Sequence, residues 1–323
     1  MHEALSGIDL RALWRGLRPH LRPTLFLEPE RLSETLGVRL RLASETFQHT
    51  GSFKFRAALA VAQHAKTGHL LAASSGNFGA ALALAARRSG KRCTIVMPAT
   101  SARVKVANVA GYGAEVDLVD TATKTRAARV AELAETLGDV AVVSAYDDPF
   151  VIAGNASLGA EIFETDAPDV VVVPVGGGGL SSGIVVARDA FGAKAAILGA
   201  EPALGNDAAR SLREGRLVAN ETEPPTICDG ARTLSLGKRN FAILREGLEG
   251  IAEVDEATVE RAVRILFELA NLKVEPTGAL AVAAVLQDPA RFAGKKVTCV
   301  VSGGNVDAEL YARLLGDRGS ASR

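Results

Sequence analysis

VVVVPVGGGGLSSGIVVA, residues 170–187, sets the fold class of this chain. Its uninterrupted β-branched run predicts a strand buried on both faces, and the apolar pattern after the glycines predicts a helix over 181–191. A buried strand that turns through glycines into a helix is the repeating unit of a parallel sheet covered by helices. Four consecutive glycines cost conformational entropy, and close approach of the backbone to an anion, most often a phosphate, is the best reason for them. A merely flexible turn is the alternative.

The same alternation of strand and helix runs through the chain. Strands are predicted in CTIVMP, AEVDLVD, VAVVSA, DVVVVPVG, AAILGAE and KKVTCVVSGG. Helices are predicted over residues 53–66, 80–89, 123–137, 151–164, 181–191, 256–272, 278–287 and 307–315. This pattern indicates an α/β fold with parallel sheets covered on both faces. A compact series of β-α units predicts a small domain over residues 68–147, inserted in a large domain of residues 1–67 and 148–323.

Composition excludes several classes of function. The 323 residues include 37 Lys and Arg against 37 Asp and Glu, so the net charge is zero and nothing indicates a nucleic-acid or anionic membrane partner. The first twenty residues lack the apolar core of a signal peptide, and no run is long enough to span a bilayer. Cys93, Cys228 and Cys299 have no metal-ligand spacing, so we expect reduced cysteines and a cytoplasmic location.

Two further loops follow predicted strands, where ligands bind in open parallel sheets. SSGNFG, which begins at Ser74, precedes a helix, and its N–H groups and hydroxyls suit a carboxylate or phosphate. SGGN, which begins at Ser302, follows the last strand. For both loops an ordinary turn is the alternative.

A dinucleotide-binding fingerprint is a rival explanation of the glycine run. Gly176 and Gly178 follow a strand, and Glu201 ends the next strand in the manner of the ribose-binding acid. Ser181 stands where the third glycine of that fingerprint belongs, so we favour the phosphate loop.

GSFKFRAALA, residues 51–60, places a lysine where a helix begins. We expect Ser52 to cap this helix, which puts Lys54 in the first turn, where the helix dipole repels a cation. This position and the flanking phenylalanines predict a lowered pKa for Lys54, and a neutral amine is what Schiff-base chemistry needs. A solvated surface lysine is the alternative. An amine, a phosphate loop and a carboxylate loop together indicate pyridoxal phosphate acting on an amino acid.

Five motifs in order, GSFKFRAA, SSGNFG, GGGGL, EPTGALAVAAVL and SGGNVD, resemble the fold-type II pyridoxal-phosphate enzymes, most closely the serine/threonine dehydratase and serine racemase group. The resemblance covers residues from about 32 to 307. It implies two open, twisted, mainly parallel sheets flanked by helices, as in the tryptophan synthase β-like fold. It also implies a homodimer.

The resemblance assigns a role to each motif. Lys54 matches the catalytic lysine that holds the cofactor, and Ser75 the second acid that racemases use on the opposite face. The implied cofactor-binding residues are Phe53, Lys54, Asn77, Gly176, Gly177, Gly178, Gly179, Leu180 and Ser302. The implied substrate-binding residues are Ser74, Ser75, Gly76, Asn77, Phe78 and Tyr146. Phe78 replaces a histidine common in the group, and Ala145-Tyr146 replaces Pro-Phe, so the substrate contacts are expected to differ.

GAEPALGND brings two acids, Glu201 and Asp207, onto one short loop. Two carboxylates this close repel each other unless a cation lies between them, and oxygen ligands suit Mg²⁺ or Ca²⁺. The resemblance implies the same divalent site, with the carbonyl of Gly205 as a third ligand. The alternative is that Asp207 caps the following helix and Glu201 pairs with an arginine.

The leading prediction is therefore an ammonia-lyase for a β-hydroxy amino acid such as serine, threonine or 3-hydroxyaspartate. An amino-acid racemase on the same scaffold is the alternative, and β-replacement, as in the cysteine synthases, is third. A non-catalytic amino-acid-binding protein lies outside the enzyme class and would not need Lys54.

Overall fold

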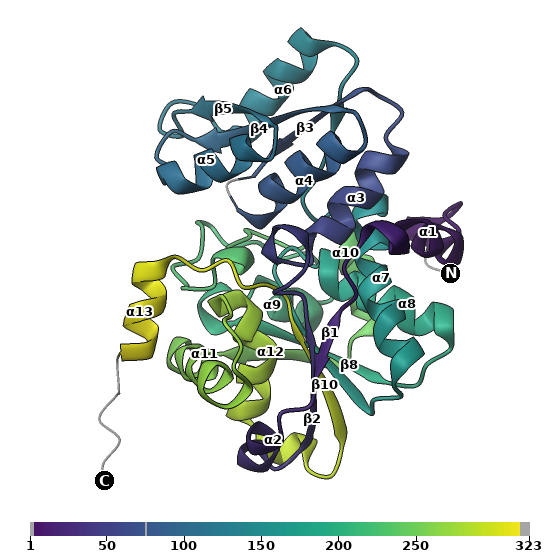
Figure 1. The fold of residues 1–323 in the computed structure, drawn as a ribbon, viewed down its shortest axis with the longest axis vertical. Helices are drawn as coiled ribbons and strands as arrows, with labels where there is room; N and C mark the ends of the chain where they lie inside the picture. Colours follow the sequence, from purple (N-terminus) through teal and green to yellow (C-terminus); the bar gives the residue numbers. More distant parts are fainter. Residues whose placement is uncertain (1–2, 75, 317–323) are drawn as a thin grey trace.

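The computed structural model describes residues 3–74 and 76–316, which form two β-sheets with helices around them (Figure 1). The six-stranded sheet has the order β1 (Leu25–Leu27), β2 (Arg39–Ser44), β10 (Lys296–Val301), β7 (Val170–Pro174), β8 (Ala196–Pro202) and β9 (Gly250–Val254). The four-stranded sheet has the order β5 (Glu115–Val119), β4 (Arg92–Pro98), β3 (His69–Ala73) and β6 (Ala141–Val142). Every pairing is parallel except that of β1 with β2, which confirms the predicted α/β class.

The helices cover both sheets. They are α1 (Leu10–Leu17), α2 (Glu30–Leu36), α3 (Lys54–His64), α4 (Asn77–Arg88), α5 (Arg103–Gly111), α6 (Arg126–Leu137), α7 (Pro149–Thr165), α8 (Gly179–Phe191), α9 (Asp207–Glu214), α10 (Lys238–Gly247), α11 (Glu256–Ala270), α12 (Pro276–Gln287) and α13 (Ala308–Gly316). Short 3₁₀ turns are η1 (Glu3–Leu5), η2 (Arg18–His20), η3 (His49–Gly51), η4 (Ala203–Gly205), η5 (Asp229–Ala231) and η6 (Pro289–Phe292). None of the helices in this described part of the chain is both long and apolar enough to cross a membrane.

The position of β7 inside the larger sheet explains why its sequence is almost purely valine. Val171 and Val173 belong to a core with α3, α7 and α8, whereas Val170 and Val172 belong to a core with α11 and α12 on the other face of the sheet. Because side chains alternate across a strand, a strand covered on both faces needs apolar residues at every position.

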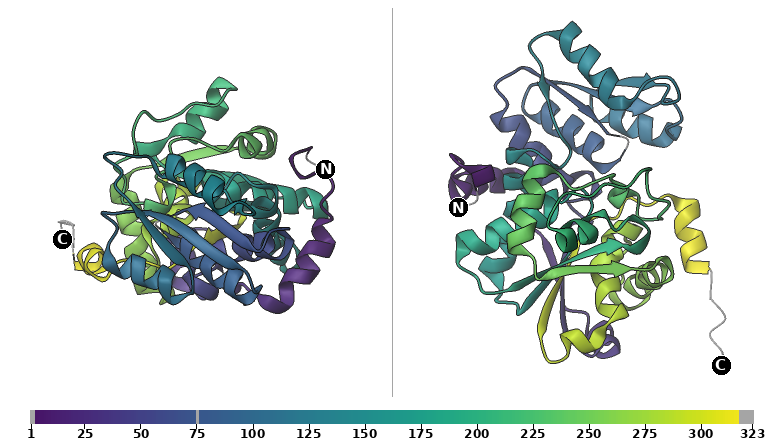
Figure 2. Two further views of the ribbon diagram at one scale, coloured as in Figure 1. Left: turned by 90° about the horizontal axis from the view of Figure 1, so that it is seen from above. Right: turned by 180° about the vertical axis from the view of Figure 1, so that it is seen from behind.

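One core joins the two sheets. The cluster that covers one face of the larger sheet continues through α3, α7 and α8 to α4 and to residues of the smaller sheet, such as Leu70 and Ile95. The right-hand view of Figure 2 shows from behind that the smaller sheet and its helices lie at one end of the larger part. The strands of the smaller sheet lie within residues 69–142, and the predicted domain limits at 67/68 and 147/148 stay a prediction.

Helix α3 is anchored by a buried ion cluster. Arg56 is entirely buried, and its Nε and Nη2 donate to Glu45 at 2.7 and 2.9 Å. Its Nη1 donates to Glu161 Oε1 at 2.8 Å, and its Nη2 also donates to Thr24 Oγ1 at 2.9 Å. These bonds tie α3 to α7 and to the segments around β1 and β2. The start of α3, where Lys54 lies, is thereby fixed.

Candidate active site

Lys54 is the first residue of α3, and its partly buried side chain lies among groups from several segments. Its Nζ donates to the carbonyl of Ala145 at 3.2 Å. The same Nζ lies 5.0 Å from the ring centroid of Phe53 and 5.8 Å from that of Phe78. The lysine amine therefore lies near two aromatic rings, but these are Phe53 and Phe78 and not the two phenylalanines that flank it in the sequence. Phe55 packs instead edge-on against His49, at 4.9 Å between centroids.

The pKa of Lys54 is lowered to about 8. Burial disfavours the cation and is the larger cause, while the negative charge of Glu275 partly opposes it. The prediction that the pKa of Lys54 is lowered is therefore confirmed, and desolvation is the main cause. A lysine with this pKa is partly neutral near pH 8 and can act as a nucleophile or a base.

The prediction that Ser52 caps α3 was wrong. The residue before the helix is Phe53, and Ser52 instead forms an antiparallel bridge with Gly303, while the N–H of Phe53 donates to the carbonyl of Ser302 at 3.0 Å. The backbone at the end of β10 therefore holds the start of the lysine helix. As a result, Ser302 lies next to the segment that carries Lys54.

The glycine loop is held through the carbonyl of Gly177. The carbonyl of Gly177 accepts from Gly237 N at 3.1 Å and from Asn240 Nδ2 at 2.8 Å. The N–H groups of residues 176–178 have no acceptor in the described part of the chain. Gly178 has a φ of +90°, and α8 begins at the next residue, Gly179. Unpaired N–H groups at the positive end of a helix fit a phosphate.

The ring of Tyr146 packs on this loop. A side-chain carbon on Gly177 would lie 2.3 Å from Cγ of Tyr146, so only glycine admits the ring. Asn240 Nδ2 also donates to the carbonyl of Tyr146 at 3.0 Å. The pKa of the Tyr146 hydroxyl is raised by burial and by the charges of Asp147 and Asp207. Tyr146 and the glycine loop are thus one packed unit beside Ala145 and Lys54.

The serine-rich loop leads into α4, which begins at Asn77 with Gly76 before it. The Oγ of Ser74 accepts from the N–H of Gly79 at 3.0 Å, which closes the loop around the helix start. Asn77 donates through Nδ2 to the two oxygens of Glu275, at 2.9 and 3.1 Å. Ser75, the predicted second acid, lies outside the described residues.

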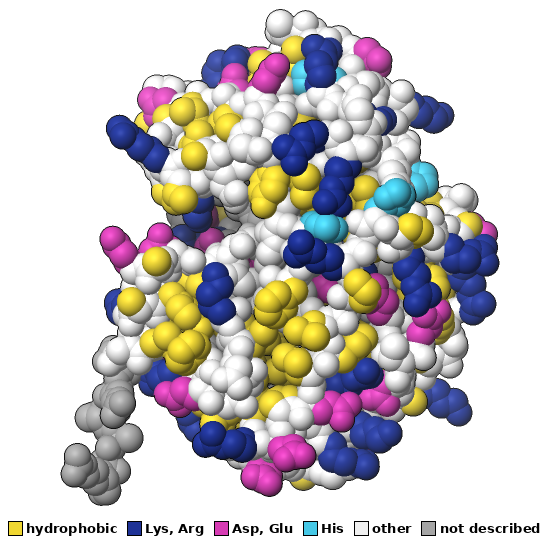
Figure 3. Space-filling view, in the orientation of Figure 1, with side chains coloured by type: hydrophobic (Ala, Val, Ile, Leu, Met, Phe, Trp, Pro, Cys, Tyr) yellow, Lys and Arg dark blue, Asp and Glu magenta, His cyan; other side chains and the backbone are white. Residues whose placement is uncertain are grey.

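Figure 3 shows the surface hollowed between the smaller sheet and the larger part, with acidic and basic side chains in the hollow. Lys105 on α5 and Asp229 in η5 pair across the two parts, with Nζ 3.4 Å from Oδ2. The pKa of buried Glu275 is raised to about 8, first by burial and then by the charge of Asp229, while the hydrogen bond from Asn77 and the charges of Lys54 and Lys105 oppose this. These groups therefore share one electrostatic environment.

Glu201 and Asp207 are both buried beside the strand end of β8. Burial and the charge of Asp207 raise the pKa of Glu201 to about 9, and burial raises that of Asp207 to about 6. Glu201 accepts from the N–H groups of Ala208 and Ala209, at 3.1 and 2.8 Å. Glu201 therefore caps α9. The alternative, in which Asp207 caps this helix and Glu201 pairs with an arginine, was wrong. The Oδ2 of Asp207 is buried and has no hydrogen-bond partner among the described residues.

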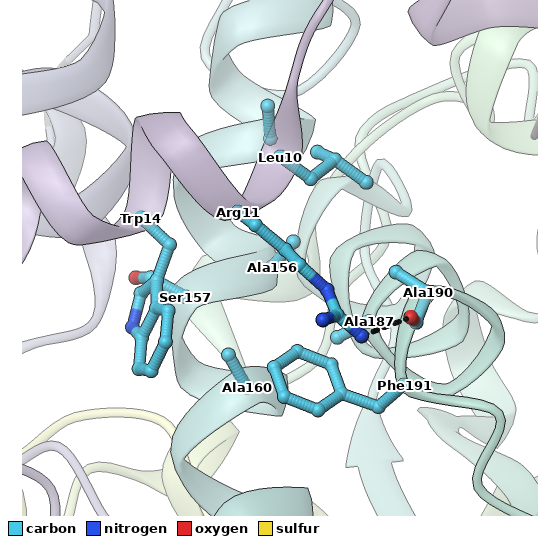
Figure 4. A pocket seen from close by; sticks show the side chains of 10 residues that line it. Leu10, Arg11, Trp14, Ala156, Ser157, Ala160, Ala187, Ala190 and Phe191 are labelled. Carbon is cyan, nitrogen blue, oxygen red and sulfur yellow. Dashed lines mark hydrogen bonds between the residues drawn. The ribbon is translucent and has the colours of Figure 1, made fainter.

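The cavities beside α1 are separate from this site. One, of about 10 Å³, lies among α1, α7 and α8, where Arg11 donates to the carbonyl of Ala190 at 3.2 Å beside Trp14 and Phe191 (Figure 4). Another, of about 560 Å³, is lined by residues that include Asp9, His64 and Phe150. Neither is lined by residues of the strand-end loops.

Three side chains at the site were not among the predicted site residues: Glu275, Asn240 and Asn305. Glu275 stands in the EPTG motif, so a signal was present, but no role followed from it. Asn240 lies in α10 with no local pattern that marks it. Asn305 stands in the SGGN motif and donates to Asn77 Oδ1 at 2.8 Å.

Comparisons with known proteins place this geometry in context. Residues 17–303 match the family model described as pyridoxal-phosphate dependent enzyme. The chain is 37% identical to the L-threo-3-hydroxyaspartate ammonia-lyase of Saccharomyces cerevisiae, over 93% of each chain. It is 38% identical to the serine racemase of Schizosaccharomyces pombe, over 95% of this chain and 96% of that one. The crystal structure of a threonine deaminase from T.th. superposes with a TM-score of 0.86 at 41% identity, covering 93% of this chain and 98% of that one.

Proposed function

This chain belongs to the pyridoxal-phosphate-dependent enzymes, and we propose that it is an ammonia-lyase that converts a β-hydroxy amino acid into a 2-oxo acid and ammonia. One observation carries the proposal: Lys54, whose pKa is lowered, donates to the carbonyl of Ala145, and the adjoining Tyr146 packs on a glycine loop whose N–H groups at 176–178 have no acceptor in the described part of the chain. The first substrate to test is L-threo-3-hydroxyaspartate, because the yeast relative is named for it. Serine and threonine follow.

The residues present fit pyridoxal phosphate. The amine of Lys54 would hold it covalently, and Gly176, Gly177, Gly178, Gly179 and Leu180 would surround its phosphate at the start of α8. Phe53 would pack beside its ring, Asn77 would donate to its ring hydroxyl oxygen, and Ser302 would face its ring nitrogen. When bound, the cofactor supplies an electron sink for negative charge at the α-carbon of the substrate.

The chain's own residues would bind and orient the substrate. The start of α4, with Ser74, Gly76 and Asn77, would hold the substrate carboxylate, because a helix N-terminus favours an anion. Phe78 and Tyr146 would contact the rest of the substrate. The amine of Lys54, once neutral, would take the proton from the α-carbon.

The acid pair fits a divalent cation. Glu201 and Asp207 are both buried, the charge of Asp207 raises the pKa of Glu201, and the Oδ2 of Asp207, which has no hydrogen-bond partner among the described residues, would supply an oxygen ligand. We assign Mg²⁺ or Ca²⁺ to the two carboxylates and the carbonyl of Gly205, because hard cations take oxygen ligands. No cluster of three or more His, Cys, Asp or Glu that could hold a metal occurs among residues 3–74 and 76–316, so a carbonyl and waters would complete the shell. The cation's role is structural.

A racemase is the second candidate, favoured by the relative from Schizosaccharomyces pombe. Inverting the α-carbon requires an acid on the face opposite Lys54, and Ser75 is the candidate for it. A Ser75→Ala variant that loses formation of the D-isomer but keeps elimination of the L-isomer supports this second activity.

The experiment that tests the proposal is a substrate panel on the purified holoenzyme. Hydroxyaspartate, serine and threonine isomers are each assayed for 2-oxo acid, ammonia and the chirality of the remaining amino acid. Release of 2-oxo acid and ammonia in equal amounts supports the ammonia-lyase. Inversion alone supports the racemase, and binding without turnover or a cofactor spectrum supports an amino-acid-binding protein.

A homodimer and a cytoplasmic location complete the proposal. Light scattering of the holoenzyme tests the first, and cell fractionation tests the second.

A further inference from the structure

The side-chain amide of Asn77 is held from both of its ends. Its Nδ2 donates to Glu275 Oε1 and Oε2, at 2.9 and 3.1 Å. Its Oδ1 accepts from Asn305 Nδ2 at 2.8 Å. Asn305 Nδ2 also donates to the carbonyl of Thr50 at 2.7 Å. A chain of hydrogen bonds therefore joins η3, the segment after β10, the start of α4 and the start of α12.

The partners decide which way the amide points. The two N–H groups of Asn305 are taken by the carbonyl of Thr50 and by Asn77, so Asn305 can only donate to its neighbour. A carboxyl oxygen of Glu275 accepts whether or not the group carries a proton. Turning the Asn77 amide over would set its N–H groups against the N–H of Asn305 and, where Glu275 is ionised, its oxygen against the carboxylate oxygens. One N–H of Asn77, shared between two oxygens of one carboxyl, satisfies Glu275 and leaves the second N–H for a ligand.

The backbone leaves room for both partners. A side-chain carbon on Gly303 would lie 2.7 Å from Glu275 Oε1, and one on Gly51 would lie 2.3 Å from Asn305 Oδ1. Glu275 is buried, with 3% of its surface exposed, whereas Asn305 is exposed. Two glycines from separate motifs thus make space for the chain of hydrogen bonds.

We propose that Glu275 and Asn305 are positioning residues that fix the Asn77 amide with one N–H directed at the ring hydroxyl oxygen of pyridoxal phosphate. This rests on the proposed function, in which Asn77 is that donor. The orientation of the amide, and not only its presence, then contributes to cofactor binding. Glu275 contributes more to holding the Asn77 amide because it is buried. At exposed Asn305, water can replace part of the lost hydrogen bonding.

The test separates hydrogen bonding from charge at Glu275. The dissociation constant of pyridoxal phosphate from the apoprotein is measured together with the visible absorption band of the bound cofactor. Glu275→Ala removes the acceptor and is expected to weaken binding about tenfold and to shift the band, the cost of roughly one buried hydrogen bond. Glu275→Gln keeps an accepting oxygen without the charge and is expected to recover most of both. Equal losses in Glu275→Ala and Glu275→Gln contradict the proposal, because charge then carries the effect.

The same measurement on Asn305 variants tests the hydrogen bond to the oxygen of the Asn77 amide. Asn305→Ala is expected to weaken cofactor binding about threefold, and Asn305→Asp more, because a carboxylate would face the oxygen of Asn77. In an Asn77→Ala background, Asn305→Ala and Asn305→Asp are each expected to change the dissociation constant of pyridoxal phosphate by less than about twofold. The effects of residues that act through one group are not additive. Effects of unchanged size in that background overturn the proposal.

Glu256→Gln is the matched control. Glu256 also accepts from a hydroxyl and a backbone N–H, those of Thr226 and Ile227, but lies outside the proposed site. Its variant is expected to leave the absorption band unchanged, and melting temperatures check that every variant is folded. If wild-type protein binds the cofactor at Lys54 but the substitutions at Asn305 and Asn77 have additive effects, this inference alone is overturned. Wild-type protein that does not bind it overturns the proposed function, and this inference falls with it.

Discussion

Arg56 and Lys54 lie two residues apart on α3, yet their surroundings are opposite. Arg56 is entirely buried and meets Glu45, Glu161 and Thr24 through its guanidinium nitrogens. Burial alone lowers its pKa, but the charges and hydrogen bonds of Glu45 and Glu161 outweigh burial and raise it. Lys54 has a carbonyl as its hydrogen-bond partner, and burial lowers its pKa to about 8.

The difference shows how one helix serves two purposes. A fully paired cation fixes the position of the helix, because removing either partner would leave an uncompensated charge. A cation that is desolvated without a direct ion pair gives up its proton readily, which suits a catalytic amine. Buried carboxylates show the same contrast. Glu45 and Glu161 are paired with Arg56, whereas the pKa of Glu201 is raised by burial and by the charge of Asp207.

The largest expected effect is on turnover in Lys54→Ala. The rate of 2-oxo acid release should fall by roughly 10³-fold or more, because the covalent attachment and the proton transfer are both lost. The melting temperature should stay the same or rise, since the variant removes a desolvated cation. Assays of 2-oxo acid and thermal melts check both, and near-normal elimination by the variant would rule out Lys54 as the catalytic amine.

Arg56→Met should show the reverse pattern. Unfolding free energy is expected to fall by about 3–5 kcal/mol, because Glu45 is left buried and unpaired. Turnover per folded molecule should fall far less than in Lys54→Ala. Denaturant titration measures the first. Arg129→Met is the matched control, since partly exposed Arg129 also meets two carboxylates, Asp117 and Glu132, and its loss should lower the unfolding free energy far less. Equal losses of unfolding free energy in Arg56→Met and Arg129→Met would contradict the special role of the buried Arg56 ion cluster.

The acid pair predicts a pH-dependent response to metal. Without a cation, the folded-state pKa values of Glu201 and Asp207 are raised, so their contribution to stability is present at low pH and lost as pH rises through about 6 and about 9. Mg²⁺ or Ca²⁺ should therefore raise the melting temperature more at pH 9 than at pH 6. EDTA should lower melting temperature and activity together, and Glu201→Gln should weaken both responses. A melting temperature indifferent to metal at both pH values argues against the cation.

Tyr146→Phe is expected to have the smallest effect. The ring that packs on Gly177 is kept and only the hydroxyl is lost, so stability should change little. If the hydroxyl contacts the substrate, kcat/KM should change by less than about tenfold, as for one hydrogen bond, and unequally among substrates. Kinetics with hydroxyaspartate, serine and threonine measure it. A uniform change in kcat/KM would mean that the hydroxyl does not discriminate among substrates.

Local pattern predicted the central strands β3 to β8 and β10, the main helices and the loops at the strand ends, because burial on two faces and glycine runs leave a mark in the sequence. It missed β1, β2 and β9, of which β2 has the residues RLRLAS, where arginines alternate with apolar residues. It also missed Arg56, whose partners lie 11 and 105 residues away. The cap at Ser52 was predicted wrongly because a distant bridge to Gly303 overrides local preference. Glu201 caps α9 for the same reason: the contact is made by folding and not by sequence neighbours.

Borohydride reduction of the holoenzyme, followed by peptide mass mapping, measures directly whether Lys54 holds the cofactor. Pyridoxal phosphate is expected to be fixed to the peptide that contains Lys54, and no cofactor is expected to be fixed in Lys54→Ala. Label on a peptide without Lys54, or undiminished label in that variant, would contradict this attachment.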